Sequence, residues 1–375
     1  MRVGYEATAL LGQRTGVGEF CYNALVALAA LPEVDLRPFA VSWRRRNRLA
    51  TSVSGLVPIR QLPMPARPLQ ASWSRFDFPW VELFTGPLDV VHGTNFVVPP
   101  SLRARRVVTV HDLTPLLYPN VADPSTLVFP RLIARAIRGG AFVHTPSAFV
   151  AAQVVEHFSA DPERVVAVPH GLPDVPEIGG NAEDGADAGI AARLAGAPYV
   201  LGLGTIEPRK GFATLVDAFA DLGDRHPDLR LVIAGQPGWG SEEVLSRVEA
   251  NPHRSRILLP GYVSSSERFK LLARASVFAY PSIYEGFGLP PIEAMALGTP
   301  VVASLAGSLP EVLGDGAELV PAGDASALAA ALARVLEDSA LREALVARAT
   351  VRISGYSWVK TAKGLAALYA KALAA

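Results

Sequence analysis

The sequence predicts an α/β protein with two domains, each built on a parallel sheet that is covered by helices. The chain has 375 residues, which exceeds the size at which one hydrophobic core usually keeps growing. Hydrophobic residues make up 50% of it, enough to fill two cores. Short β-branched runs alternate with helical patterns almost throughout, and this alternation is typical of parallel sheets.

The predicted strands form two groups of five. The first group consists of MRVGY (1–5), DVVHG (89–93), RRVVTVH (105–111), AFVHTP (141–146) and RVVAVPHG (164–171). The second consists of PYVLGLG (198–204), LRLVIAG (229–235), RILLPGYV (256–263), SVFAYPS (276–282) and TPVVAS (299–304). Each group is long enough to form one doubly wound unit.

The segment between the groups reads EIGGNAEDGADAGIAARLAGA, residues 177–197, and its Gly, Ala and acidic content is typical of a linker. We therefore predict domains at residues 1–185 and 186–355, with the helical pattern of 356–375 packing back on the first domain. Open parallel sheets bind ligands at the carboxyl ends of their strands. Two such sheets facing each other predict a binding cleft between the domains.

Composition excludes several classes of function. Lys plus Arg and Asp plus Glu both number 35, so no overall positive field favours nucleic acid as a partner. The single cysteine, Cys21, excludes an internal disulfide and a multi-cysteine zinc site, and it fits a reducing compartment. The sequence indicates neither a signal peptide nor a membrane span. We expect a cytoplasmic protein.

Two adjacent cations, Arg209 and Lys210, follow the predicted strand at 198–204 and precede a helical pattern that starts near Phe212. Helix amides and the helix dipole favour an anion at this position. Arg offers a planar fork and Lys a mobile point charge, and together they suit a diphosphate. The alternative is that both are solvated loop cations.

The segment YEGFGLPPIEAMALGTP, residues 284–300, places two glutamates around a Gly-Pro turn. Pro291 suits the first turn of a helix, which predicts Glu293 within that turn, where an acid can simply satisfy free amides. That alternative does not explain Glu285, which lies on the loop before the helix. Two carboxylates so placed can accept hydrogen bonds from hydroxyls at different parts of one polyol ligand.

These motifs together resemble the retaining glycosyltransferases of family 4, whose fold is GT-B. The resemblance rests on the E-x7-E spacing of EGFGLPPIE, on GTIEPRKG upstream and on PGYVS between them, and it spans nearly the whole chain. It implies that Glu293 binds the ribose of a nucleotide-diphosphate sugar, that Arg209 and Lys210 hold the diphosphate, and that Glu285 lies beside the transferred sugar. The other donor-binding residues that it implies are Gly16, Gly18, Gly204, Gly286, Phe287, Gly288 and Leu289.

The first domain contributes His111 and Asp112 at the end of the strand RRVVTVH. The resemblance implies that His111 contacts the donor sugar, whereas a lone histidine at a strand end is otherwise more often structural. Asp112 orients His111, contacts the acceptor or caps the next turn. In TGVG, Gly16 and Gly18 match the glycine loop of the family, although an ordinary strand-to-helix turn explains them equally well.

His92, His144 and His170 also lie near strand ends, but no helical His pair or nearby acid makes them a metal set. Members of this family generally hold the diphosphate with cations and helix ends. We therefore expect no metal and no cofactor.

Acceptor binding is expected in the first domain. Arg44 and Arg45 lie in PFAVSWRRRNRL, and Trp73 lies in the aromatic-rich segment PLQASWSRFDFPWVELF. Basic and aromatic groups together suit a lipid-linked acceptor or peripheral contact with the anionic inner face of a membrane. A solvated loop with ordinary core aromatics is the alternative.

The expected reaction moves a sugar from the donor to a saccharide or lipid-linked acceptor, with retention, to form an α-glycoside. The segments HDLTPLLYP and EGFGLPPIEAMA most resemble bacterial mannosyltransferases that use GDP-mannose in polysaccharide or glycolipid assembly. Related enzymes use other sugars. A nucleotide-sugar 2-epimerase and a non-catalytic nucleotide-sugar-binding partner protein are the alternative functions.

Overall fold

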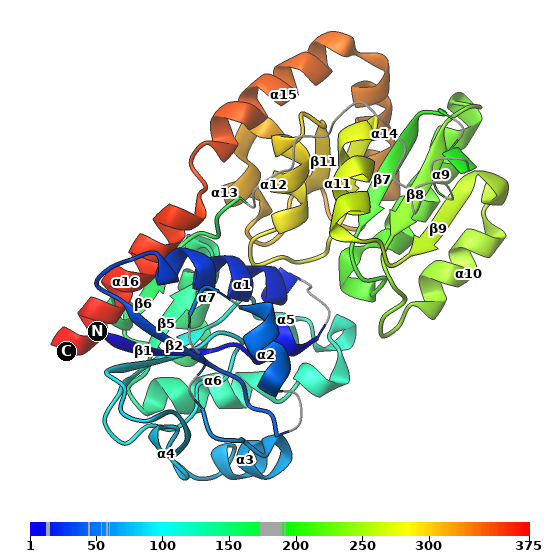
Figure 1. The fold of residues 1–375 in the computed structure, drawn as a ribbon. Coiled ribbons are helices and arrows are strands. Elements are labelled where there is room, and N and C mark those ends of the chain that lie inside the picture. Colours follow the sequence, from blue (N-terminus) through cyan, green and yellow to red (C-terminus); the bar gives the residue numbers. More distant parts are fainter. Residues whose placement is uncertain are drawn as a thin grey trace. The chain divides into compact units, whose positions relative to one another are not determined.

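The computed structural model describes residues 1–12, 16–43, 46–53, 55–57, 59, 61–172, 190, 193–194 and 196–375. The chain forms two compact units (Figure 1). The first contains Met1–Leu117, Pro124–Gly171 and Tyr356–Ala375, and the second contains Tyr118–Asp123 and Leu172–Gly355. The predicted boundary between residues 185 and 186 lies outside the described residues.

The first unit is built on a six-stranded parallel sheet with the strand order β2-β1-β3-β4-β5-β6. Its strands are β1 (Arg2–Glu6), β2 (Asp35–Phe39), β3 (Val90–Gly93), β4 (Arg105–Thr109), β5 (Phe142–Thr145) and β6 (Val165–Ala167). Its α-helices are α1 (Gly16–Ala29), α2 (Arg46–Ser52), α3 (Ala66–Trp73), α4 (Glu82–Thr85), α5 (Thr114–Leu117), α6 (Phe129–Arg138), α7 (Ala148–Phe158) and α16 (Trp358–Ala374). Short 3-10 helices are η1 (Thr8–Leu11), η3 (Pro124–Thr126) and η4 (Pro162–Arg164).

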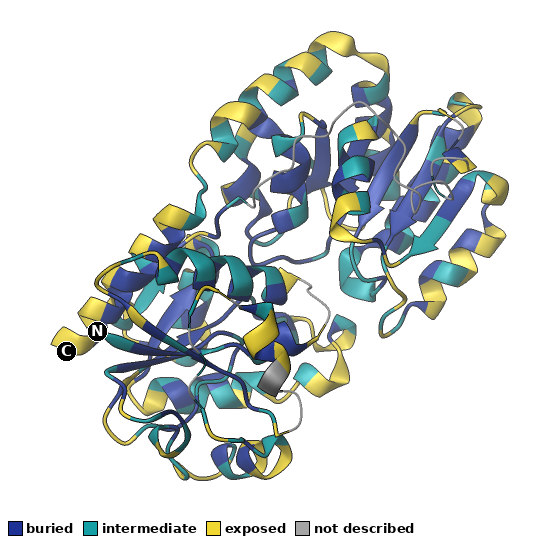
Figure 2. Ribbon diagram, viewed as in Figure 1, coloured by how far each residue is buried: buried dark blue, intermediate teal, exposed yellow. Residues whose placement is uncertain are grey.

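Helices cover both faces of this sheet because successive side chains of a strand point to opposite sides. Val107 and Phe142 pack in the cluster that α1 and α16 contribute to. Their neighbours Val108 and Val143 pack with residues of α6 and α7 on the other side. The central strands of both sheets are accordingly buried, whereas the edge strands are partly exposed, as Figure 2 shows.

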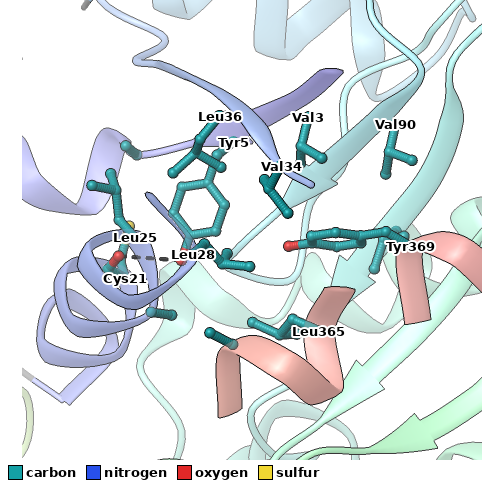
Figure 3. Packing of buried hydrophobic residues seen from close by; sticks show 14 of the residues in the cluster. Val3, Tyr5, Cys21, Leu25, Leu28, Val34, Leu36, Val90, Leu365 and Tyr369 are labelled. Carbon is teal, nitrogen blue, oxygen red and sulfur yellow. Dashed lines mark hydrogen bonds between the residues drawn. The ribbon is translucent and has the colours of Figure 1, made fainter. Parts of the chain in front are cut away.

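The C-terminal helix α16 belongs to the first unit. It begins after Ser357, whose side chain accepts a hydrogen bond from the amide of Lys360, as an N-cap does. Leu365 and Tyr369 pack with Val3 and Tyr5 of β1 (Figure 3). The end of the chain therefore completes the core that its beginning starts.

The second unit contains another six-stranded parallel sheet, with the order β12-β11-β10-β7-β8-β9. Its strands are β7 (Tyr199–Leu203), β8 (Arg230–Ala234), β9 (Ile257–Gly261), β10 (Val277–Tyr280), β11 (Val301–Ser304) and β12 (Glu318–Val320). Its α-helices are α9 (Phe212–Arg225), α10 (Glu242–Ala250), α11 (Ser265–Arg274), α12 (Leu289–Ala296), α13 (Leu309–Leu313), α14 (Ala325–Glu337) and α15 (Ser339–Ile353). The 3-10 helices are η2 (Pro119–Val121), η5 (Pro208–Lys210), η6 (Arg254–Arg256) and η7 (Gly314–Gly316).

These sheets confirm the predicted α/β class, but the sequence analysis missed β2 and β12. Both are edge strands. Pro38 lies inside β2, and proline is tolerated at an edge because it has no amide hydrogen to donate. β12 has three residues. β2 (DLRPF) and β12 (ELV) lack the continuous β-branched run by which buried strands are recognised. The other two edge strands, β6 and β9, lie within longer apolar runs and were predicted.

In the described part of the chain, no helix is both long and apolar enough to cross a membrane.

Candidate functional site

Each sheet has a topological switch point, which is the place where the chain leaves two neighbouring strands in opposite directions. This point lies between β1 and β3 in the first sheet and between β7 and β10 in the second. Loops diverge there at the carboxyl ends of the strands, and open α/β sheets bind their ligands in the crevice that results. The loops after β7 and β10 carry Arg209, Lys210 and Glu285.

In the second unit, Glu285 lies between the two cations. Its Oε1 is 2.7 Å from Nζ of Lys210, and its Oε2 is 3.0 Å from Nη1 of Arg209. The hydroxyl of Tyr280 donates to the same Oε1 over 3.0 Å. Arg209 also pairs with Glu207 at 2.8 Å. The structure thus brings the two cations and one of the two predicted glutamates into direct contact.

The charges in this cluster stabilise one another. Burial alone would raise the pKa of Glu285, but Arg209 and Lys210 outweigh it and lower the pKa to about 2. Burial lowers the pKa of Lys210, and Glu285 opposes that change. Glu285 is therefore an anion at neutral pH, and it fixes the positions of both cations.

Gly211 allows the two loops to approach each other. Its φ is +66°, and a Cβ atom added to it would lie 2.0 Å from the carbonyl oxygen of Pro281. The carbonyl of Arg209 accepts a hydrogen bond of 2.8 Å from the amide of Ile283. A glycine is required because any side chain would collide with the loop after β10.

Glu293 lies in the second turn of α12, not in the first turn as predicted. The helix begins at Leu289, directly after Gly288 at φ +96°, so Pro291 occupies the first turn and Glu293 follows it. An acid in the second turn does not cap the first amides, so the capping explanation fails. Glu293 is 1% exposed, and Nη2 of Arg268 lies 3.4 Å from its Oε1.

In the first unit, His111 is buried at the carboxyl end of β4. Its Nε2 lies 2.8 Å from the carbonyl oxygen of Thr94. A carbonyl only accepts hydrogen bonds, so Nε2 carries the proton and Nδ1 does not in the neutral ring. Burial lowers the pKa of His111, which favours this neutral form.

Three matches with known proteins bear on the function. The profile described as "Glycosyltransferase Family 4" matches residues 14–174, and the profile described as "Glycosyl transferases group 1" matches residues 190–352. An O-antigen chain mannosyltransferase B of Escherichia coli is 30% identical over 72% of this chain and 71% of its own length.

The chain belongs to glycosyltransferase family 4, the group 1 glycosyltransferases.

A second relative of this glycosyltransferase is a phosphatidyl-myo-inositol mannosyltransferase of Mycolicibacterium smegmatis. It is 40% identical over 40% of this chain and 39% of its own length. The family predicted from the sequence is confirmed, and the protein is a glycosyltransferase.

Solved structures confirm the GT-B fold of this glycosyltransferase. A sucrose-phosphate synthase of Thermosynechococcus elongatus has a TM-score of 0.71 and 21% identity, covering 100% of this chain and 99% of its own. The Anabaena Alr3699/HepE structure with UDP and glucose has a TM-score of 0.74 and 18% identity, covering 98% of both chains.

Two residues proposed for the glycine loop of the glycosyltransferase lie in α1. The helix begins at Gly16, and Gly18 is buried within it. The other residues predicted to bind the donor lie on or next to the switch-point loops of the second unit. Gly204 follows β7 at φ +147°, Gly286 and Phe287 follow Glu285, and Gly288 and Leu289 open α12.

Asp112 caps a turn. Its Oδ1 accepts a hydrogen bond of 2.8 Å from the amide of Thr114, at the start of α5. Of the three roles that the sequence analysis left open, the structure thus shows the capping contact.

Trp73, which the sequence analysis assigned to acceptor binding, lies in the core of the first unit. Its side chain is buried in a core cluster with Leu69 and Val81, and its Nε1 donates to the carbonyl oxygen of Pro79 over 2.8 Å. An aromatic residue at helical spacing in α3 serves the core, and the exposed aromatics follow it at Phe76 and Phe78. Arg44 and Arg45 lie outside the described residues.

Two other histidines of the first unit, His92 and His144, belong to a hydrogen-bonded chain. His144 Nε2 donates to the carbonyl of Val168 (3.0 Å), so its Nδ1 accepts from the hydroxyl of Thr109 (2.9 Å). The Thr109 oxygen then accepts from His92 Nε2 (2.7 Å), and His92 Nδ1 accepts from Tyr369 (2.7 Å). Burial lowers the pKa of His144 to about 3. Each ring is a neutral structural link.

Among the described residues, no group of three or more His, Cys, Asp and Glu side chains could hold a metal ion.

Sequence reasoning missed Glu6, which ends β1 at the switch point of the first sheet. The rule that led to His111 and Glu285, a polar residue directly after a buried strand, applies to it equally.

Proposed function

We propose that this glycosyltransferase transfers mannose from GDP-mannose, with retention, to a hydroxyl group of a saccharide or lipid-linked acceptor. The observation that carries the donor assignment is the fixed pair of cations on Glu285 at the switch point of the second sheet. The mannosyl group is supported by relatives whose names specify an O-antigen chain and phosphatidyl-myo-inositol mannosyltransferase.

Arg209 and Lys210 hold the diphosphate in this proposal. When the bond between the sugar carbon C1 and the leaving phosphate oxygen breaks, negative charge grows on that phosphate. Cations that a buried carboxylate already holds in place need little reorganisation to stabilise this charge. They contribute more to the transition state than to donor binding, and such a difference accelerates the reaction.

Retention follows a front-face path in this proposal. The acceptor oxygen bonds to C1 on the face that the phosphate leaves, and the leaving phosphate oxygen takes the acceptor proton. Charge neutralisation by Arg209, Lys210 and the first amides of α12 supports catalysis without a metal. The Oε1 atom of Glu293 is oriented by Arg268, and we assign this carboxylate to the ribose hydroxyls.

A donor screen tests the proposal. The purified protein is incubated with GDP-mannose, UDP-glucose, UDP-N-acetylglucosamine and dTDP-rhamnose, and its melting temperature and the released nucleotide are measured. We expect GDP-mannose alone to stabilise the protein and to release GDP, and Glu293→Gln to weaken both responses. Glu311→Gln, which changes a glutamate on α13 of the same unit, is the matched control.

The products decide between the alternatives. A mannosylated acceptor or free mannose supports transfer, whereas an isomerised donor sugar would show a 2-epimerase. Stabilisation without release of a nucleotide would favour a binding protein. A response to another donor would overturn the mannose assignment. If none of the four donors stabilised the protein or released a nucleotide, the assignment of this site to a nucleotide sugar would be overturned.

Peripheral contact with an anionic membrane belongs to the same proposal, because a lipid-linked acceptor lies at a membrane surface. Phe76 is 63% and Phe78 54% exposed on the turn after α3, next to the exposed Arg75, and Arg67 at the start of α3 is also exposed. Exposed aromatic and basic side chains together favour an anionic interface.

Co-sedimentation with phosphatidylglycerol vesicles tests the contact. We expect salt-sensitive binding that the double variant Phe76→Ser/Phe78→Ser loses and that Val351→Ser, at an exposed valine of α15, retains. Absence of binding by the unaltered protein would remove the membrane contact.

A further inference from the structure

Glu6 lies at the switch point of the first sheet, as the loops after β7 and β10 lie at the switch point of the second. It is the last residue of β1, and β1 pairs with β3 so that Tyr5 faces His92. Thr94 follows β3 directly. The two residues therefore lie at the carboxyl edge of the sheet, where the chain leaves β1 and β3 in opposite directions and where open α/β sheets bind ligands.

Buried hydrogen bonds fix the backbone around Glu6. The hydroxyl of Thr94 donates to the main-chain carbonyl of Glu6 over 2.7 Å. The carbonyl of Thr94 accepts the Nε2 proton of His111 over 2.8 Å. Thr94 and His111 are both buried, while Glu6 is half-buried. The backbone at Glu6 is thus fixed by buried polar contacts, and the residue as a whole is partly exposed.

One oxygen of this carboxylate has acceptor capacity to spare. Oε1 accepts the amide of Thr8 at 2.8 Å, whereas the contact of Oε2 with the Thr94 hydroxyl is 3.5 Å, which is long for a hydrogen bond. Within the described part of the chain, no cation forms an ion pair with Glu6. Glu285 differs, because two cations and a tyrosine occupy its two oxygens.

A partly desolvated carboxylate oxygen without a cation favours a hydrogen-bond donor from outside. Burial raises the pKa of Glu6, which is the expected response of a carboxylate that has lost water without gaining a positive partner. A ligand hydroxyl would replace the lost water with a charge-assisted hydrogen bond. An anionic ligand group would be repelled. The position therefore selects a neutral polyol.

We propose that Glu6 binds a hydroxyl group of the acceptor sugar and that Thr94 holds Glu6 in position for this contact. The inference rests on the proposed function, because it assumes that the polyol is the sugar to which the glycosyl group is transferred. It adds to that function a residue, Glu6, that positions the acceptor. It also adds a preference, at Glu6, for a neutral pyranoside over a phosphorylated sugar.

The competing explanation is that Glu6 only caps the turn of η1 through the amide of Thr8. Glu6→Gln separates the two explanations. Glutamine keeps an oxygen for Thr8 and thus the cap, but it removes the charge that strengthens a bond to a ligand hydroxyl. A capping role predicts no change in ligand binding on this substitution.

The experiment is a titration of the full chain with methyl α-D-mannopyranoside, followed by saturation-transfer NMR, with melting temperatures measured in parallel. We expect saturable binding to the unaltered protein. For Glu6→Gln we expect a dissociation constant about tenfold larger and an unchanged melting temperature. Glu163→Gln, at an exposed glutamate of the same unit that pairs with Lys371, is the matched control and should bind normally. Mannose 6-phosphate should bind no better than the methyl glycoside.

Two results would overturn the inference: no saturable binding by the unaltered protein, or equal binding by Glu6→Gln. The outcome is independent of the donor screen. Loss of pyranoside binding in Glu6→Gln with an intact GDP-mannose response supports both proposals. If Glu6→Gln loses pyranoside binding but the unaltered protein responds to no donor, Glu6 still binds a polyol. Glycosyl transfer from the tested donors is then contradicted.

Discussion

Lys210 donates to Glu285 over 2.7 Å across 75 residues of sequence, and both side chains are largely buried. The pair exists because β7 and β10 are neighbours in the sheet, which places the loops that follow them at one edge. Removing one partner of a buried ion pair strongly destabilises the fold, because the other partner remains buried and charged without compensation.

The first prediction concerns the role of Lys210 in turnover. Lys210→Ala should lower kcat by about 100-fold, as removal of one transition-state charge partner does, and should weaken donor binding by less than about tenfold. Steady-state rates and calorimetric donor affinities provide the comparison, with the exposed Lys363→Ala as control. Equal losses in kcat and affinity would contradict the assignment.

The second prediction concerns pH. The pKa of Glu285 falls from 4.5 to about 2 on folding, so its ionised form contributes stability that is present above pH 4.5 and is lost as pH falls toward 2. By linkage the contribution is about 3 kcal/mol at neutral pH.

Glu285→Gln should therefore unfold at lower urea concentration than the unaltered protein at pH 7, and the gap between the two should narrow at pH 4. Urea titrations at the two pH values measure this gap. A gap that widens on acidification would show that Glu285 does not stabilise the fold as an anion.

The third prediction concerns Gly211. Gly211→Ala has two costs. An alanine in the left-handed backbone conformation costs about 1 kcal/mol of stability, and its Cβ atom collides with the carbonyl of Pro281. Gly323→Ala is a matched control, because Gly323 also has a positive φ but a Cβ there meets nothing within 4 Å. We expect Gly323→Ala to show only the backbone cost in thermal unfolding, and Gly211→Ala to lose more stability and also donor binding. Equal effects of the two variants would mean that the contact with Pro281 is unimportant.

The fourth prediction concerns the histidine chain. Thr109→Val removes the hydroxyl that hydrogen-bonds His92 and His144. Two buried ring nitrogens then lose this partner, and each loss costs about 1–3 kcal/mol of stability. We expect a clear loss of unfolding free energy in urea, whereas Thr350→Val, at an exposed threonine of α15, should change little. Donor binding, assigned to the second unit, should be retained, and its loss would place the chain in the donor site.

Much of the architecture could be predicted from the sequence because buried strands and the residues that follow them are local features. The ten predicted strands all appear, and Arg209, Lys210 and Glu285 lie at the strand ends where the pattern placed them. The same reasoning missed β2 and β12, because DLRPF and ELV carry no β-branched run, whereas the edge strands β6 and β9 carry apolar runs and were found.

The sequence by itself determined the fold class, the family and the types of side chain that the switch-point loops carry. Only the tertiary structure decided that Trp73 packs in the core, that Glu293 lies beyond the first turn of α12, and that Thr94 hydrogen-bonds both Glu6 and His111. The physical reason is that periodicity and turn chemistry act between near neighbours in the chain, whereas burial and ion pairing depend on the order of strands in a sheet. That order brings together residues that the sequence holds far apart.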